Sequence, residues 1–185
     1  MNQESGIEKR ALILILGLVL IFFWFRPAKH MEQKLPDQIA TKIPANLIIE
    51  KLSLFVPIIE AASNDELAIQ VALERGVVHL AGTSEPGKVG NCYIVGHSSD
   101  YPSSYGSYKS VFARLPELVG GDEIRIKTPN ESFVYRIFET RIVEATDLSV
   151  LAQDSGGRKL LTLQTSYPIG TARQRFLVVA QLVEK

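Results

Sequence analysis

Short strand-like segments separated by turn residues run through residues 44–185, and they limit the possible folds more than any other feature. The segments are rich in β-branched and large apolar side chains, which favour extended backbone. They occupy residues 47–59 with a break at Pro57, 76–81, 92–96, 123–128, 132–145, 160–165 and 175–183. Seven or eight short strands at this spacing predict a mostly-β barrel or sandwich with one or two short helices. The length suits one domain with one core.

A short helix is predicted between the first strands. Residues 63–66 read Ser-Asn-Asp-Glu, which matches a capping box and predicts a helix start, and Gly76 is a typical helix end. The spacing places Leu67, Val71 and Ala72 on the inner face of this helix.

The segment 11–25 is apolar throughout and carries no charge. Fifteen helical residues span roughly 22 Å, a little less than the hydrocarbon core of a bilayer, and flanking basic side chains can snorkel to the surface. A cleaved signal peptide is the alternative, but no small-x-small cleavage site follows the segment. We therefore expect a transmembrane anchor over 11–25, after a cytoplasmic segment 1–10 and before a juxtamembrane linker 26–43.

The orientation of this anchor is not decided by its flanking charges. Two basic residues, Lys9 and Arg10, precede it, and three follow it within ten residues. Long C-terminal domains nevertheless translocate largely regardless of such charges. We expect a single-pass protein of the cell membrane whose domain 44–185 lies outside the cytoplasm.

Composition excludes several classes of function. The 20 basic and 20 acidic side chains cancel, which argues against a nucleic-acid partner. The single cysteine, Cys92, rules out an internal disulfide and a zinc site built on thiolates. His79 lies in an apolar strand without nearby ligands and is interpreted as structural. The sequence predicts no metal and no cofactor.

Three polar residues stand at strand ends beside apolar runs, and they are the candidates for chemistry: His97, Ser166 and Arg175. Each of them, taken alone, is more typical of a turn or of the surface. The chain around them changes that interpretation.

Three ordered blocks of the chain resemble the sortase family. They are ALERGVVHLAGTSEPGKVGNCYIVGHS at 72–98, VFARLPELVGGDEI at 111–124 and LLTLQTSYPIGTARQRFLVVAQL at 160–182. The last block is similar to the family's Thr-Leu-x-Thr-Cys pattern followed by Pro, Gly and an arginine that opens a strand. The resemblance implies a sortase-like closed β-barrel behind an N-terminal transmembrane helix. It also implies a membrane-anchored transpeptidase that joins sorting-signal peptides of surface proteins to an amine acceptor.

The resemblance also assigns the site. His97 matches the family's catalytic histidine, and Arg175 matches its catalytic arginine. Arg173 lies nearby, but Arg175 stands directly before the Phe-Leu-Val-Val strand, as the family's arginine does. Position 166 matches the nucleophile, and there the chain departs from the family, which has cysteine where this chain has Ser166.

Serine and cysteine make different demands on such a site. A thiol needs only a modest lowering of its pKa from about 8.5 to act as a thiolate, whereas a serine hydroxyl needs a neutral histidine base, preferably oriented by a carboxylate. Asp100 follows His97 in a loop and is a weak candidate for that carboxylate. Cys92 cannot replace the missing thiol, because five residues of regular strand place it on the opposite face from His97, roughly 16 Å along the chain.

Two functions therefore stay open at this point. The first is a sortase-type acyl transferase or peptidase with Ser166 at the nucleophile position. The second is a catalytically silent sortase-fold protein that binds peptide signals or partners at the membrane. A separate explanation of Ser166 is the deliberate replacement of a native cysteine.

Overall fold

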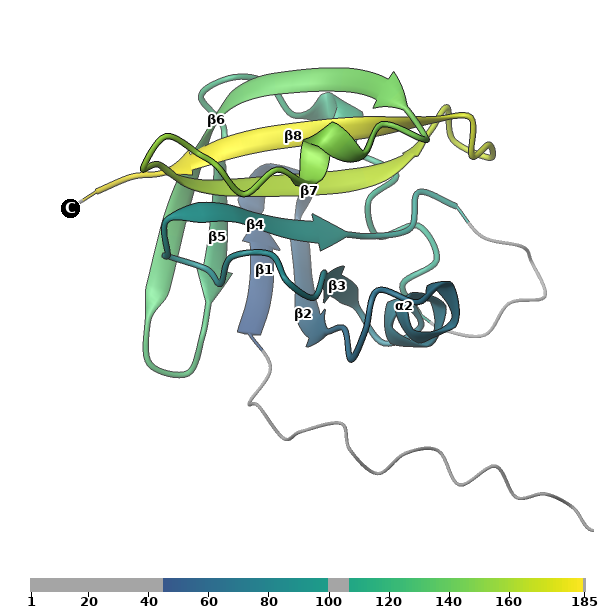
Figure 1. Cartoon of the computed structure of the whole chain (residues 1–185), viewed down its shortest axis with the longest axis horizontal. Helices are drawn as coiled ribbons and strands as arrows, with labels where there is room; N and C mark the ends of the chain where they lie inside the picture. The colour runs from purple at the N-terminus through teal and green to yellow at the C-terminus, as the bar shows by residue number, and fades with distance from the viewer. Residues whose placement is uncertain (1–44, 100–106, 185) are drawn as a thin grey trace, which may run out of the picture. The chain divides into compact units, whose positions relative to one another are not determined.

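The computed structural model describes residues 45–99 and 107–184, and these contain a closed barrel of eight strands in the order β1-β2-β3-β4-β7-β8-β6-β5 (Figure 1). The strands are β1 Ala45–Ile49, β2 Leu54–Glu60, β3 Val77–His79, β4 Gly90–Val95, β5 Glu123–Lys127, β6 Ser132–Glu144, β7 Lys159–Tyr167 and β8 Gln174–Leu182. The described part also contains one α-helix and three short 3-10 helices: α2 Glu66–Leu73, η1 Glu50–Leu52, η2 Leu115–Glu117 and η3 Leu148–Leu151. The predicted mostly-β barrel is confirmed.

Two parallel pairs interrupt an otherwise antiparallel barrel. β2 pairs with β3 in parallel, and the connection between them carries α2. β4 pairs with β7 in parallel, although β5 and β6 separate them along the chain. β7 then pairs with β8 antiparallel. This topology makes β4, β7 and β8 neighbours, and the ends of these three strands carry the candidate site.

The sheet around β4, β7 and β8 is covered on both faces. Alternate side chains point into the barrel and form its core, among them Cys92, Ile94, Leu161, Leu163, Val178 and Ala180. The intervening side chains point outward and are buried beneath α2 and η3: Tyr93, Val95 and Leu177 pack with Ala72, Leu73 and Val150. Strands that are buried on both faces read as continuous apolar runs, which is what β4 and β8 show in the sequence.

Two local predictions were wrong. The helix has Asp65 as its N-cap, without a side-chain capping bond, instead of a capping box opened by Ser63. Of the predicted inner face, Ala72 is buried as expected, together with Leu73, whereas Leu67 is 76% and Val71 is 40% exposed.

The break predicted at Pro57 is also in a different place. The chain turns at η1, where Ser53 adopts a left-handed conformation with φ of 51°. Pro57 remains inside β2, opposite Asn46 of β1. A strand can accept one proline by giving up one ladder hydrogen bond.

The predicted transmembrane anchor over 11–25 lies outside the described residues. Within the part that is described, no helix is long and apolar enough to cross a membrane.

Candidate active site

Ser166 and Arg175 lie on the neighbouring strands β7 and β8, and His97 follows the end of β4 by two residues. Ser166 of β7 is the direct register partner of Arg175 of β8. On the other side, Val95 of β4 pairs with Gln164 of β7, and the Gly96 N–H donates to the Gln164 carbonyl at 3.1 Å. Continuing this parallel register by two residues brings His97 beside Ser166. Because neighbouring strands lie about 4.8 Å apart, Ser166 stands between the two other residues.

The three side chains leave the sheet on the same face. Val95 and Leu177 belong to the outer cluster beneath α2 and η3. Side chains two positions apart in a strand share a face, so His97 and Arg175 also point outward. Ser166 is the register partner of Arg175 and therefore shares that face, while the intervening Thr165 is buried on the inner side.

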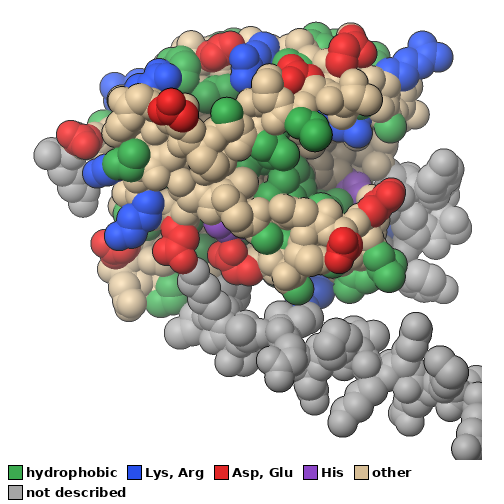
Figure 2. Space-filling view, in the orientation of Figure 1, with side chains coloured by type: hydrophobic (Ala, Val, Ile, Leu, Met, Phe, Trp, Pro, Cys, Tyr) green, Lys and Arg blue, Asp and Glu red, His purple; other side chains and the backbone are tan. Residues whose placement is uncertain are grey.

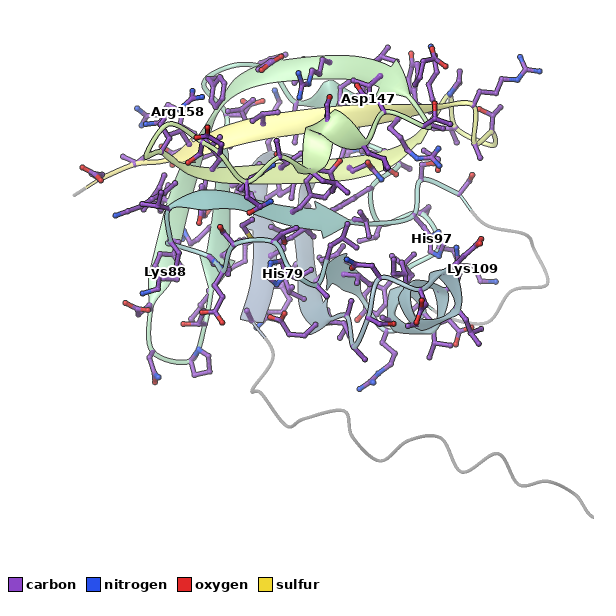
Figure 3. The ribbon with its side chains drawn as sticks, in the orientation of Figure 1. His79, Lys88, His97, Lys109, Asp147 and Arg158 are labelled. Carbon is purple, nitrogen blue, oxygen red and sulfur yellow. The ribbon has the colours of Figure 1, made fainter. Side chains whose placement is uncertain are left out.

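The surface beside these residues is hollowed. Figure 2 shows hydrophobic side chains gathering in a hollow across this face, and Figure 3 places His97 just beyond the end of β4. We call this hollow the outer groove: its floor is β4, β7 and β8, and α2 and η3 pack on the same outer face.

The backbone around His97 is held firmly, whereas its ring is not. The His97 carbonyl accepts a hydrogen bond from the Phe112 N–H at 2.8 Å. The Thr165 hydroxyl donates to the Gly96 carbonyl at 2.8 Å, which ties the end of β4 to β7. The imidazole is partly exposed, and none of the residues in 45–99 and 107–184 forms a hydrogen bond with it. A neutral imidazole in this position can accept a proton.

The Arg175 guanidinium bonds to its own loop. Its Nη1 donates to the carbonyls of Ala172 and Gln174, each at 3.0 Å. In the described part of the chain no carboxylate forms a salt bridge with it. Burial raises the pKa of the Tyr93 phenol, and the charges of Arg141 and Arg175 oppose that shift.

The Ser166 hydroxyl is partly exposed, and it forms no hydrogen bond with the described residues. The three side chains are thus neighbours without being bonded to one another. Catalytic hydrogen bonds are often long or absent before substrate binds, so this arrangement is compatible with an unliganded active site.

Of the other candidates named from the sequence, Cys92 lies on the opposite side of the sheet. Cys92 is 1% exposed inside the barrel, and burial raises the pKa of its thiol, with further contributions from Glu60 and Glu85. Its thiol therefore stays protonated and lies on the opposite face of β4 from His97. Arg173 is exposed in the loop before β8, and Asp100 lies outside the described residues.

His79 is buried at the end of β3 with both ring nitrogens engaged. Its Nδ1 lies 2.8 Å from a carboxylate oxygen of Glu60, and its Nε2 lies 3.0 Å from the Ser84 carbonyl and from the Thr83 hydroxyl. Within the described ranges, no three His, Cys, Asp or Glu residues are grouped so as to hold a metal ion.

The sequence analysis missed two glutamines whose side chains join distant parts of the barrel. Gln164 stands on the outer face two residues before Ser166, and its carboxamide oxygen accepts the Tyr93 hydroxyl at 2.7 Å. Gln153 joins η3 to the rest of the barrel: its carboxamide oxygen accepts the Ser84 N–H at 3.0 Å and the Asn91 N–H at 3.3 Å. A glutamine interrupting the run Leu-Leu-Thr-Leu was a visible signal for Gln164, whereas the partners of Gln153 are more than 60 positions away.

Comparison with known proteins assigns the fold to a family. The sequence model of the Sortase domain matches residues 47–183. Sortase D of Bacillus subtilis (strain 168) is 29% identical over 140 residues, which cover 74% of this chain and 62% of that protein. The match therefore spans less than two thirds of the length of this relative.

Solved structures agree with the sequence matches. A Clostridium perfringens protein described as a Sortase D5 transpeptidase superposes with a TM-score of 0.63 at 30% identity, over 76% of this chain and 79% of that one. Sortase C-1 from Actinomyces oris gives a TM-score of 0.64 at 26% identity, over 76% of this chain and 73% of that one.

Proposed function

The chain belongs to the sortase family, and we propose that its barrel domain is a sortase-type transpeptidase or peptidase with Ser166 at the position of the nucleophile. It acts on sorting-signal peptides of surface proteins and passes them to an amine acceptor or to water. The observation that carries this proposal is the row of His97, Ser166 and Arg175 on adjacent strands, on one face, beside the outer groove.

In the proposed reaction His97 acts as a neutral base. It takes the proton of the Ser166 hydroxyl while the oxygen attacks the carbonyl carbon of the peptide. Arg175 turns from its loop carbonyls towards the negative oxygen of the tetrahedral intermediate. Protonated His97 then gives its proton to the leaving amine, and an ester between the peptide and Ser166 remains. An amine or a water molecule, deprotonated by His97, attacks this ester and regenerates the serine.

A second function has its own support. Neither the Ser166 hydroxyl nor the His97 ring is hydrogen-bonded to a described residue, and the guanidinium of Arg175 is turned to its own loop. A silent sortase-fold protein that only binds peptides in the outer groove would also fit these contacts.

The substitution Ser166→Cys separates the two functions. The full-length native chain, the Ser166→Cys form and each of these with His97→Ala are incubated with a library of LPxTG-like peptides and an amine. Cleavage, amine transfer and a trapped acyl-enzyme mass are measured. A thiol at position 166 can be held as a thiolate by a protonated histidine, so we expect acylation in the cysteine form.

Acylation of the native chain that is lost in His97→Ala identifies a true serine enzyme. Peptide binding without acylation in either form supports the binding protein. Failure of every form to bind or cleave any peptide contradicts both functions.

The location of the domain is part of the proposal. Residues 11–25 anchor the chain in the cell membrane, and the barrel faces outward, where surface proteins pass. The full-length chain is then expected in the membrane fraction after carbonate extraction, with a barrel that is digested by protease added to intact cells. A protected barrel would reverse the proposed orientation.

A further inference from the structure

The outer face of the sheet behind the site has one partly exposed polar side chain between two buried apolar ones. In the row of residues behind the site, Val95, Gln164 and Leu177 are register partners on β4, β7 and β8. Val95 and Leu177 are buried in the outer cluster, whereas Gln164 is partly exposed. An apolar residue would continue this surface, and a carboxamide between two aliphatic side chains is costly unless its donors and acceptors are satisfied.

The orientation of this carboxamide is set by Tyr93. The Tyr93 side chain is fully buried, and its hydroxyl donates to Gln164 Oε1 at 2.7 Å. Turning the amide around would place an N–H group against the phenol and leave the phenol proton unpaired in a buried position. The Gln164 Nε2 group, with its two N–H donors, therefore points away from Tyr93.

These donors have no acceptor among the described residues, and they are not sealed in the interior. In that part of the chain, the Ser98 hydroxyl is the one buried side-chain polar atom that lacks a hydrogen bond. Gln164 Nε2, which no described carbonyl or carboxylate accepts, is therefore accessible from the outer groove.

The spacing between Gln164 and Ser166 fits an extended peptide. The two residues share a face and are separated by two steps of a strand, about 6.6 Å. When an extended peptide lies along β7 with its reacting carbonyl at Ser166, the peptide residue two positions from that carbonyl lies beside Gln164, because the repeat of the peptide matches that of the strand. The groove runs back from Ser166 along the strand, whereas the chain leaves the sheet after Tyr167. The acyl part of the substrate stays attached to the enzyme after cleavage and has to remain bound. We therefore place it in the groove along β7, and we place the leaving part beyond Tyr167.

We propose that Gln164 is a specificity-determining residue, which donates a hydrogen bond from Nε2 to a carbonyl oxygen two residues before the scissile bond. Tyr93 is its positioning residue. This inference rests on the proposed function of the domain, and it adds a polar selection to an otherwise apolar groove. It requires no chemistry at Gln164 and holds equally for a peptide-binding protein without catalytic activity.

The test measures binding by the full-length native chain, so that it does not depend on the nucleophile. The probe is the LPxTG-like peptide that binds most tightly, together with analogues in which one backbone carbonyl at a time is replaced by methylene. The protein variants are Gln164→Met, which keeps the length without donors, and Tyr93→Phe, which removes the hydroxyl. Thermal unfolding establishes that both variants are folded.

We expect one analogue to lose about three- to tenfold in affinity for the native chain, as for one hydrogen bond. The same analogue should bind Gln164→Met no more weakly than the unmodified peptide does, because the two changes remove one interaction. Tyr93→Phe should lower the affinity for the unmodified peptide by a smaller factor than Gln164→Met does. The mass of the acyl-enzyme in the Ser166→Cys form identifies the scissile bond, and the sensitive carbonyl should lie two residues before it.

If every analogue loses the same affinity for the native chain as for Gln164→Met, the inference is wrong, but the proposed function is not affected. A sensitive carbonyl at another position would also overturn it. Failure of all forms to bind any peptide would overturn the inference together with the proposed function.

Discussion

Two histidines at the ends of neighbouring strands have opposite environments. His79 ends β3 and is 5% exposed, with Nδ1 held by the Glu60 carboxylate and Nε2 by the Ser84 carbonyl. His97 follows β4, is partly exposed, and has a ring without a hydrogen bond to any residue in the described ranges. The strands themselves are paired, with Val78 opposite Val95. Two histidines close together in one sheet thus have different roles.

The difference shows how to separate a structural from a reactive histidine. Proton transfer at either nitrogen of His79 would disrupt a buried hydrogen bond, so its ring serves to join β2, β3 and the loop before β4. The ring of His97, which forms no hydrogen bond within 45–99 and 107–184, is placed to exchange a proton with a bound substrate or with Ser166. Mutation of His79 should therefore lower the stability of the protein, whereas mutation of His97 should lower its activity.

The largest effect is expected for His97→Ala. In whichever form of the chain acylates, native or Ser166→Cys, we expect the acylation rate to fall by about 10²- to 10⁴-fold, since a positioned acid–base group contributes that much. The free energy of unfolding should change by less than about 0.5 kcal/mol, as for other surface side chains without partners. Acyl-enzyme mass against time and urea unfolding measure the two quantities. An acylation rate within threefold of the parent would remove His97 from the site.

For His79→Phe we expect a loss of stability with little change in activity. The substitution removes the hydrogen bonds to Glu60, Ser84 and Thr83 in a buried place, and we expect the free energy of unfolding to fall by about 2 to 3 kcal/mol. Acylation per folded molecule should stay within about twofold of the parent. His79→Gln, which keeps a donor of similar reach, is the matched control and should lose less. A stable His79→Phe protein with lost activity would reverse the assignment of the two histidines.

The barrel and the relation between Cys92 and His97 followed from the sequence because both depend on strand periodicity. Alternation along 92–97 is a local property: it predicted Cys92 and His97 on opposite faces, and Cys92 is indeed buried in the barrel core. The exposure of Leu67 did not follow, because it depends on where an eight-residue helix begins. Ala72 and Leu73 pack with Val78 of β3 in one buried cluster, and no local pattern contains such contacts.

The lining of the outer groove was also beyond the sequence. The resemblance placed His97, Ser166 and Arg175 in one site, and strand order then made them neighbours. The contacts of Gln153 and the bond between Tyr93 and Gln164 join residues 62 to 71 positions apart. Such contacts require the parallel pairing of β4 with β7, which periodicity alone does not predict.

An intermediate effect is expected at Ser84, which connects His79 with the η3 side of the groove. Its carbonyl faces His79 Nε2 at 3.0 Å, and its N–H and hydroxyl donate to Gln153 at 3.0 and 3.1 Å. Gln153→Ala should lower the free energy of unfolding by about 1 to 2 kcal/mol. Because the two side chains share Ser84, the combination with His79→Phe should be non-additive by about 0.5 to 1 kcal/mol.

Urea unfolding of the two single variants and the double variant measures this coupling. Gln153→Ala with His97→Ala is the control pair and should be additive within about 0.5 kcal/mol, because the two residues share no partner. Additivity in the first pair would show that His79 acts independently of the groove.

The smallest effect is expected at Asp147, at the start of η3 (Figure 3). Its Oδ1 accepts from the Ser149 hydroxyl at 2.6 Å and from the Ser149 N–H at 3.0 Å, and these bonds lower the pKa of the Asp147 carboxyl. Stabilisation of η3 by this carboxylate is therefore complete above its ordinary value of about 3.9 and is lost as the pH falls through the lower value of the folded state. The effect is local because Asp147 is exposed.

Amide resonances of η3 should record this loss without a transition of the whole barrel. We expect the Ser149 and Val150 amides to shift and to exchange faster below about pH 4, and this dependence should disappear in Asp147→Asn, whose side chain keeps the shape without the titrating charge. Glu117 of η2 also has a lowered pKa, because the Arg114 guanidinium bonds to it. Its neighbours should titrate unchanged in Asp147→Asn and serve as an internal control. A Ser149 titration that persists in Asp147→Asn would mean that another carboxylate, and not this cap, controls the start of η3.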